Sequence, residues 1–403
     1  MLDIIYSLFH HHKKWRDIKM SELSELYLSN TIKTLAVSLV GIFVPIYLLD
    51  LGYSLSEVAI FHVIFFGVRP SFDLLSGWLV VRYGPKHVMR LSYFVTTISM
   101  ALLVTLGEIN YPLWLVAVLW SFSWSSYWLA YHADFSKVKD EPTEGKEFGN
   151  MAIFVRLASA FGPLIGGLLA WVINVQFVFI VSVGMMFLAA VPLMLSPEPI
   201  KRRNNLSFER IPPKKIWRDL LSYWGAGFES ITPTVIWPLY IAVAVFAFDD
   251  AVYAKVGFFS SLALVFGIVL LRYSGKLLDR HKGGMLFRYS TMASALTHGV
   301  RPLITNGLGV GVMSLIYEPF YNGFRLGLTK GIYDRADSFG KARVSYLAVM
   351  QTAIASAKLI FAVIFWILAV NYEPVKALQL ALLVSALGTA ISLVHRFPGL
   401  KDK

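Results

Sequence analysis

Apolar residues are gathered into long stretches along the chain, and short polar connections separate these stretches. About 20 apolar residues in helical form are needed to cross the hydrocarbon core of a bilayer. Proline and glycine inside such stretches are tolerated, because neighbouring helices satisfy the backbone groups that they free. Stretches of spanning length occur at about 24–49, 55–80, 87–107, 111–133, 149–171, 176–196, 219–246, 256–275, 284–305, 308–330, 342–369 and 374–395. The pattern predicts an all-α membrane protein with twelve transmembrane helices.

The bases that lie between these stretches are unevenly distributed. Almost all of them occur in the terminal segments and in the connections on one side of the predicted membrane, whereas the opposite side carries Lys255, Arg301 and Lys376. Cytoplasmic loops of membrane proteins are enriched in lysine and arginine. We therefore expect a multi-pass protein of a prokaryotic plasma (inner) membrane, with both termini in the cytoplasm.

Composition agrees with a membrane location. Of the 403 residues 56% are hydrophobic and 15% are charged, and the mean hydropathy is +0.61. A soluble domain has about 25% charged residues. Loops that face anionic lipid account for the net charge of +12. The chain has no cysteine, which excludes disulfides and thiolate nucleophiles.

Two polar segments suggest the division into domains. Residues 1–23 mix large apolar side chains with bases, which is typical of an amphipathic helix in the membrane interface. The run SPEPIKRRNNLSFERIPPKK at 196–215 is rich in proline, asparagine and bases, but is too short to fold as a nucleic-acid reader. We expect a linker at 198–216 between six-helix bundles at 24–197 and 217–396, a tail at 397–403, and no nucleic-acid partner.

An internal repeat supports two related halves. YWLAYHADFSK at 127–137 aligns with FYNGFRLGLTK at 320–330, and GKEFG at 145–149 aligns with GKARV at 340–344. GWLVVRYGPK at 77–86 aligns with GKLLDRHKGG at 275–284, so that three landmarks follow in the same order at nearly the same offset. Repeated six-helix halves are one known transporter architecture, with the substrate site between the halves. The repeat predicts two pseudo-symmetric six-helix bundles.

The segment GKLLDRHKGG resembles the loop motif of the major facilitator superfamily, Gly-x-x-x-Asp-Arg/Lys-x-Gly-Arg-Arg/Lys. Gly275, Asp279 and Arg280 stand in register with it. In the first half Gly77, Arg82, Gly84 and Lys86 match, whereas Val81 replaces the aspartate, and Asp73 one turn earlier is a candidate substitute. The resemblance implies the major facilitator fold and a conformational latch at these residues. Ordinary interfacial charges are the alternative interpretation.

The fifth stretch contains AFGPLIGG at 160–167. Its residues Gly162, Pro163, Gly166 and Gly167 are similar to a motif that this superfamily's antiporters carry in the same span. Small residues four apart also form a ridge against which another helix can pack closely. An antiport signature and simple helix packing are both compatible with this sequence.

Ionisable residues inside the stretches are the main functional signal, because burial of a charge in hydrocarbon costs about 2.5–3.5 kcal/mol. Glu229, Glu318 and Lys358 lie near the predicted middle of the membrane, and we expect a substrate or proton site there in which an acid pairs with Lys358 or Arg156. Arg69 and Asp73 are four residues apart and can neutralise each other. Lys33 and Arg325 are long enough to extend to the interface. The excess of bases hints at an anionic group in the cavity.

Aromatic residues follow helical spacing in two equivalent stretches. Trp124 and Trp128 lie in the fourth stretch, and Tyr317 and Tyr321 lie in the tenth. Such rings can stack on a planar ligand or bind a cation, and the alternative is packing against other helices.

Together these patterns favour a secondary transporter that moves a small molecule by alternating access, with proton-coupled export as the preferred mode. Uniport, symport and a membrane-embedded transferase are the alternatives, and a receptor with the transporter fold is a further one. No ATP-binding motif and no His-Glu-x-x-His or Gly-x-Ser-x-Gly motif occurs in the chain. We expect a monomer in the lipid bilayer, a small-molecule substrate, protons as the coupling partner, and no enzyme activity, cofactor or metal.

Overall fold

The computed structural model describes residues 22–109, 111–138, 145–195, 211–279, 283–339, 342–394 and 397. Within these residues the chain is helical and has no strand, and a helix covers every stretch that the hydrophobic pattern selects. The expected interfacial segment 1–23, the linker 198–216 and the tail 397–403 lie largely outside the described residues, and Arg280 lies outside them too.

The helices follow one another with short connections. The first-half helices are α3 (Glu22–Val40), α4 (Val44–Asp50), α5 (Leu55–Gly67), α6 (Arg69–Tyr83), α7 (Pro85–Thr105), α8 (Leu113–Val138), α9 (Gly145–Val172) and α10 (Val175–Ala190). The second-half helices are α11 (Pro213–Ile231), α12 (Trp237–Tyr240), α13 (Val252–Asp279), α14 (Gly283–Val300), α15 (Gly307–Asp337), α16 (Arg343–Asn371) and α17 (Pro374–Ala390). Short π- and 3₁₀-helical turns extend several of them: η1 (Pro192–Met194), η2 (Thr232–Ile236), η3 (Ile241–Val245), η4 (Arg301–Leu303) and η6 (Ile391–Val394).

Ten helical segments of the described chain are long and apolar enough to cross a membrane. Helices α14 and α15 are not among them, although the hydrophobic pattern predicts spans at 284–305 and 308–330. Their mean hydropathy is lowered by polar side chains that are buried inside the protein: Ser290, Thr291, Ser294, Thr297, His298, Ser314, Tyr317 and Glu318. A helix whose polar face is turned inward needs less apolar surface than one that lipid surrounds.

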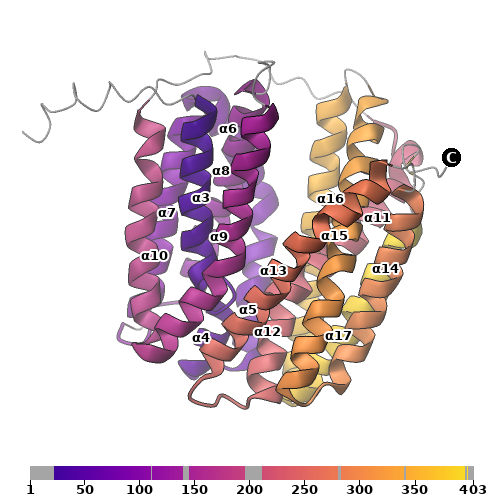
Figure 1. Ribbon diagram of the computed structural model, residues 1–403. Coiled ribbons are helices and arrows are strands. Elements are labelled where there is room, and N and C mark those ends of the chain that lie inside the picture. The colour runs from indigo at the N-terminus through magenta and orange to yellow at the C-terminus, as the bar shows by residue number, and fades with distance from the viewer. Residues whose placement is uncertain are drawn as a thin grey trace, which may run out of the picture.

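The molecule has two ends, which we call the terminal face and the distal face. Helices α3 and α11 begin, and α17 ends, at the terminal face, and the short hairpins lie at the distal face (Figure 1). Side-chain caps start helices at the distal face: Asn174 accepts from the Phe177 N–H at 2.7 Å, and Asn306 accepts from the Gly309 N–H at 2.8 Å. At the terminal face Gly84 ends α6 with φ of 90°, a conformation that favours glycine.

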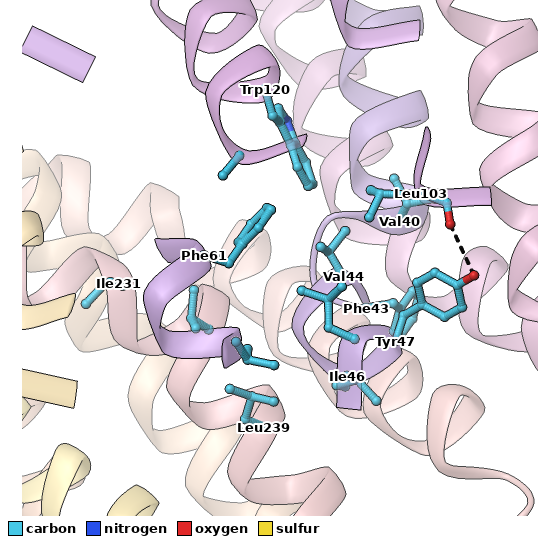
Figure 2. Close-up of a cluster of buried hydrophobic side chains, with 14 of the residues drawn as sticks. Val40, Phe43, Val44, Ile46, Tyr47, Phe61, Leu103, Trp120, Ile231 and Leu239 are labelled. Carbon is cyan, nitrogen blue, oxygen red and sulfur yellow. Dashed lines mark hydrogen bonds between the residues drawn. The ribbon is translucent and has the colours of Figure 1, made fainter. Parts of the chain in front are cut away.

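The two sets of helices contact each other through α9 with α13 and through α5 with α16. In Figure 1 the ribbons of the two sets draw apart toward the terminal face and approach each other toward the distal face. One continuous apolar cluster includes residues of both sets, among them Phe43, Phe61, Ile231 and Leu239 (Figure 2). The main core therefore joins the two sets near the distal face.

Small residues of α9 form a two-sided seam at this junction. A Cβ atom at Gly166 would lie 2.9 Å from the Leu39 carbonyl carbon in α3, and one at Gly162 would lie 2.9 Å from the Ser38 carbonyl carbon. Gly167 faces the other way, toward the Tyr253 and Ala254 backbone in α13. The ridge predicted in the fifth stretch thus packs against two helices at once.

Replacement of Gly166 by alanine should destabilise the protein by about 1–3 kcal/mol, because the new methyl group overlaps backbone atoms that cannot move aside. Gly184 in α10 is the matched control, since a Cβ atom there meets nothing within 4 Å. Gly184→Ala should leave stability unchanged or raise it by up to about 1 kcal/mol. Thermal unfolding of the purified variants in detergent measures both effects. Equal melting temperatures for the two variants would contradict a close contact at Gly166.

Candidate functional site

A fully buried polar network lies among the second-half helices and is centred on Glu229 of α11. One carboxylate oxygen of Glu229 accepts from the Tyr317 hydroxyl at 2.7 Å. The other oxygen accepts from the Thr389 hydroxyl at 2.7 Å and lies 2.9 Å from His298 Nε2. The network connects α11, α14, α15 and α17, and the side chains of Glu229 and His298 are 0% exposed.

Arg301 completes this network and fixes the protonation of His298. Its Nη1 lies 3.0 Å from His298 Nδ1, and a guanidinium can only donate, so Nδ1 accepts. The remaining proton of a neutral imidazole is then on Nε2, which donates to Glu229. The guanidinium also lies 4.5 Å from the Trp237 ring and 4.2 Å from the Tyr317 ring. His298 therefore bridges a buried carboxylate and a buried guanidinium.

The expectation that Arg301 is a loop base on the far side of the membrane is wrong. Arg301 is 1% exposed and belongs to the protein interior. The sequence reasoning also missed His298. A signal was present in the stretch 284–305, where Ser290, Thr291, Ser294, Thr297 and His298 follow helical spacing and mark one polar face.

Glu318 lies next to this network on α15 and has a different environment. It is 7% exposed, and its carboxyl forms no hydrogen bond or ion pair with another described residue. The absence of a side chain at Gly267 of α13 makes room for it, because a Cβ atom there would lie 3.0 Å from Glu318 Oε1. The charges that reach it are those of Arg325, Arg301 and Glu229. Glu318 is thus a buried acid without a hydrogen-bond donor in the described structure.

Four bases, which we call the central bases, lie near the middle of the long helical segments. They are Arg69 at the start of α6, Arg156 of α9, Arg325 of α15 and Lys358 of α16. Lys358 is within electrostatic reach of Arg69 and Arg325, and Arg156 is within reach of Arg325. None of the four forms an ion pair with a described residue, so the expected pairing of an acid with Lys358 or Arg156 is not found there.

The expected neutralisation of Arg69 by Asp73 is incomplete. The two side chains sense each other's charge, but no ion pair forms between them in the described structure. The Arg69 Nε atom is buried without a hydrogen-bond partner. Arg69 therefore keeps a polar atom that the protein itself does not satisfy.

The aromatic residues of α8 surround a lysine. Lys33 Nζ lies 3.7 Å from the centre of the Tyr127 ring, 5.4 Å from that of Trp124 and 5.2 Å from that of Trp128. Lys33 is 7% exposed, so it does not extend to the interface as expected. In the second half Tyr321 stacks on Tyr317 at 5.4 Å, and Arg325 lies 5.7 Å from the Tyr321 ring. In both halves the aromatic stripe packs against cations.

The residues expected to form a latch are only partly described. Arg82 is exposed and its guanidinium packs on Trp78 and Tyr83 at 5.1 and 5.6 Å. Gly77 contacts Leu129 of α8 and Gly84 makes the turn before α7. Gly275 and Asp279 belong to α13, but their burial and contacts are not among those that the structure describes. Lys86, which matches the motif's last position, forms a buried ion pair with Glu25 at 3.4 Å.

The described residues contain no group of three His, Asp or Glu side chains that could hold a metal ion.

Comparison with known proteins gives a consistent result. The model of the Major Facilitator Superfamily matches residues 26–333. Two structures of the nucleoside transporter NupG, one of them a mutant, superpose with TM-scores of 0.69 and 0.70 at 10% sequence identity, covering 93% of this chain and 98% of theirs. A structure titled as a bacterial metal transporter superposes with a TM-score of 0.64 at 14% identity, covering 93% of this chain and 97% of the other. No curated protein sequence matches the chain.

The Glu229 network should show strong energetic coupling. Glu229→Gln should destabilise the protein by about 3–5 kcal/mol, because it leaves the Arg301 guanidinium buried without an anion. Combination with Arg301→Met should recover part of this loss, with a coupling of about 1–3 kcal/mol in a double-mutant cycle of thermal stability. Thr389→Val is the control, since it removes one of several donors to the carboxylate but leaves the charge pair, and it should cost about 1.5–3 kcal/mol. Additive effects of Glu229→Gln and Arg301→Met would show that the imidazole bridge carries no coupling.

Proposed function

Because the chain belongs to the Major Facilitator Superfamily, we propose that it is a secondary transporter that carries a small molecule across a membrane by alternating access. In this proposal α14 and α15 cross the membrane together with the ten apolar segments, which gives twelve spans. Residues 24–197 and 217–396 act as two six-helix bundles that rock about their junction, and residues 198–216 link them. Membership of this family supports transport, rather than an enzymatic reaction, as the activity in this proposal.

The proposal places the terminal face in the cytoplasm and the distal face outside, in a prokaryotic plasma membrane. The distribution of bases over the loops supports this orientation. Residues 1–23 then lie in the cytoplasmic interface, and the tail 397–403 is cytoplasmic. Large exposed apolar side chains such as Leu74, Leu303 and Leu308 are suited to contact lipid around a monomer.

The observation that carries the proposal is the set of contacts that close the distal side between the two sets of helices. The Tyr253 hydroxyl donates to Asp50 Oδ2 at 3.0 Å, and the Leu164 N–H donates to Ser261 Oγ at 2.8 Å. Phe43 also packs edge-on against Tyr253, with ring centres 5.6 Å apart. Toward the terminal face Arg156 and Arg325 are exposed. These features are those expected of a transporter that is open to the cytoplasm.

The polar contacts across the distal junction are individually weak. Each hydrogen bond contributes about 1 kcal/mol net, so the few that cross the junction add only modestly to the apolar cluster that also spans it. A second apolar cluster lies wholly within the second half. Rocking of the halves exchanges these polar contacts and part of the apolar packing at the junction.

We further propose proton-coupled export with Glu318 as the residue that takes up the proton. Glu229 already receives two hydroxyl donors and an imidazole, whereas Glu318 receives none from the described residues. A carboxyl group buried without donors is more stable in its uncharged form, and contact with water reverses this preference. Glu318 faces charges of Arg325 on its own helix, Arg301 of η4 and Glu229 of α11. Uniport and symport remain the alternatives of the same fold.

A cysteine at Ser261 should report the opening of the distal side. The chain has no native cysteine, and Ser261 is 3% exposed at the junction of α9 and α13. We expect slow but complete reaction of Ser261→Cys with a membrane-impermeant maleimide added from outside. Ser182→Cys is the matched control, because Ser182 is 0% exposed inside the first half and bonds to the Ala36 carbonyl. Alternating access is refuted if the two cysteines react at the same rate.

The same reporter should respond to pH through Glu318. A low pH favours the uncharged carboxyl and therefore the conformation described here, so labelling of Ser261→Cys should slow from about pH 8 to about pH 5. The labelling rate of Ser261→Cys at each pH is divided by the rate of Asp250→Cys at the same pH. Asp250 lies in the exposed distal loop, so this ratio removes the pH dependence of thiol reactivity. Glu318→Gln should abolish the remaining pH dependence. Persistence of the full dependence in that variant would assign proton coupling to another group.

A further inference from the structure

Each of the two sets of helices contributes two of the central bases. Arg69 and Arg156 belong to the first half, and Arg325 and Lys358 belong to the second. The electrostatic neighbours cross the junction, since Arg69 faces Lys358 and Arg156 faces Arg325. Packing agrees with this arrangement. A Cβ atom at Gly67 would lie 3.6 Å from the Leu359 side chain. Lys358 Nζ lies 5.8 Å from the ring of Phe66, which precedes Arg69 by three residues.

The described residues supply too few acids to balance these charges. Two other bases of the described helices are matched by acids, Lys86 by Glu25 at 3.4 Å and Arg335 by Asp219 at 3.3 Å. Glu229 is occupied by its own network. The acids within electrostatic reach of the central bases are Asp73 and Glu318, and neither forms an ion pair with a described residue. Four positive charges therefore face two negative charges.

Such an excess is costly near the middle of a membrane. A charge that is buried in hydrocarbon costs about 2.5–3.5 kcal/mol, and the exposed bases Arg156 and Arg325 still add mutual repulsion. A packing role does not require it, because apolar residues of similar size would fill the same space without this cost. The excess is explained if a negative charge that is absent from the chain comes to the site.

We propose that the central bases bind the anionic group of the transported molecule, a carboxylate, phosphate or sulfonate, between the two halves. This inference rests on the proposed transport function and names its substrate class. The guanidinium groups of Arg69, Arg156 and Arg325 offer paired donors that fit oxyanions, and the buried Nε of Arg69 has no acceptor among the described residues. The Tyr321 ring beside Arg325 supplies a flat apolar surface for the rest of the molecule.

The same charges connect binding to the conformational change. Without a ligand, repulsion between Arg156 and Arg325 and between Arg69 and Lys358 opposes closure of the terminal side. An anion placed between these pairs replaces repulsion across the junction by attraction to both halves. Binding then favours closure of the terminal side, and the distal contacts open in exchange. The bound anion is thereby the switch for alternating access.

A lipid headgroup is the other source of the same chemistry, and the position of the bases argues against it. Headgroups lie about 15 Å from the middle of the bilayer, because the hydrocarbon core is about 30 Å thick. The central bases lie near the middle of their helical segments, and Arg69 carries an atom buried from the surface. A soluble small anion that enters from the open terminal side reaches them directly.

Thermal unfolding of the purified full chain in neutral detergent tests the proposal with two soluble probes, pyrophosphate and citrate, against sodium chloride of equal ionic strength. At least one probe should raise the melting temperature of the wild type in a saturable way. Arg325→Gln and Lys358→Gln should each raise the melting temperature of the ligand-free protein, because repulsion is relieved. Each should also weaken the response to the probe by about tenfold in half-saturating concentration. Lys376→Gln is the control, because Lys376 is an exposed base at the distal end of α17 and should behave as the wild type.

Three results would overturn the proposal. The first is a wild type that responds to neither probe beyond the chloride control. The second is a lower melting temperature of ligand-free Arg325→Gln and Lys358→Gln with an unchanged response, which would make the bases structural. The third is stabilisation by phosphatidylglycerol in nanodiscs without any response to the soluble probes, which would identify a lipid site. Labelling of Ser261→Cys decides separately whether alternating access holds, so failure of the substrate class and failure of the transport function are distinguishable.

Discussion

A charge inside the hydrocarbon layer has to be compensated by the protein, and this constraint organises the structure. The chain meets it in three ways. Glu229 and Arg301 compensate each other through neutral His298. Lys33 is held against the faces of three aromatic rings. The central bases are left uncompensated by described residues, and they are the ones that lie across the junction. The degree of compensation thus separates the parts that must stay rigid from the part that must respond.

The proposed rocking of two halves requires a junction that is tight and yet able to move. Helix α9 is suited to this role, because Gly162 and Gly166 face α3 within the first half while Gly167 faces α13 of the second half. The apolar cluster continues across this junction, and single hydrogen bonds such as that from Tyr253 to Asp50 supplement it. The motif that resembles an antiporter signature therefore has a packing role in any case. That role is compatible with antiport and does not establish it.

The hydrophobic pattern was sufficient to place helical structure over each stretch that it selected, because the length of a membrane crossing is fixed by the bilayer and apolar composition follows from lipid contact. It did not predict the breaks inside these stretches, such as that between α5 and α6. It also selected Glu229, Glu318, Arg156 and Lys358 as site candidates, since charges inside apolar stretches are conspicuous, whereas Arg69 and Arg325 were expected to be paired or interfacial. The pattern could not predict which side chains these charged residues would contact. Arg301 was counted with the bases of the far side because it lies near the end of the stretch 284–305, and only the packing of η4 against α17 and α14 shows that it is inside. The expected Arg69–Asp73 pair depended on side-chain orientation, which spacing alone does not determine.

The aligned segments of the two halves each hold a cation against aromatic rings. Trp124 and Tyr317 occupy equivalent positions in the aligned segments, and each packs against a cation from a neighbouring element, Lys33 and Arg301. In the second half the cation is linked to an acid, so that α11, α14, α15 and α17 are joined by directional bonds. In the first half Lys33 has only aromatic faces, which hold a cation without fixing its direction. Both aligned segments thus place a cation on the aromatic stripe, and among the described residues only the second half links that cation to an acid.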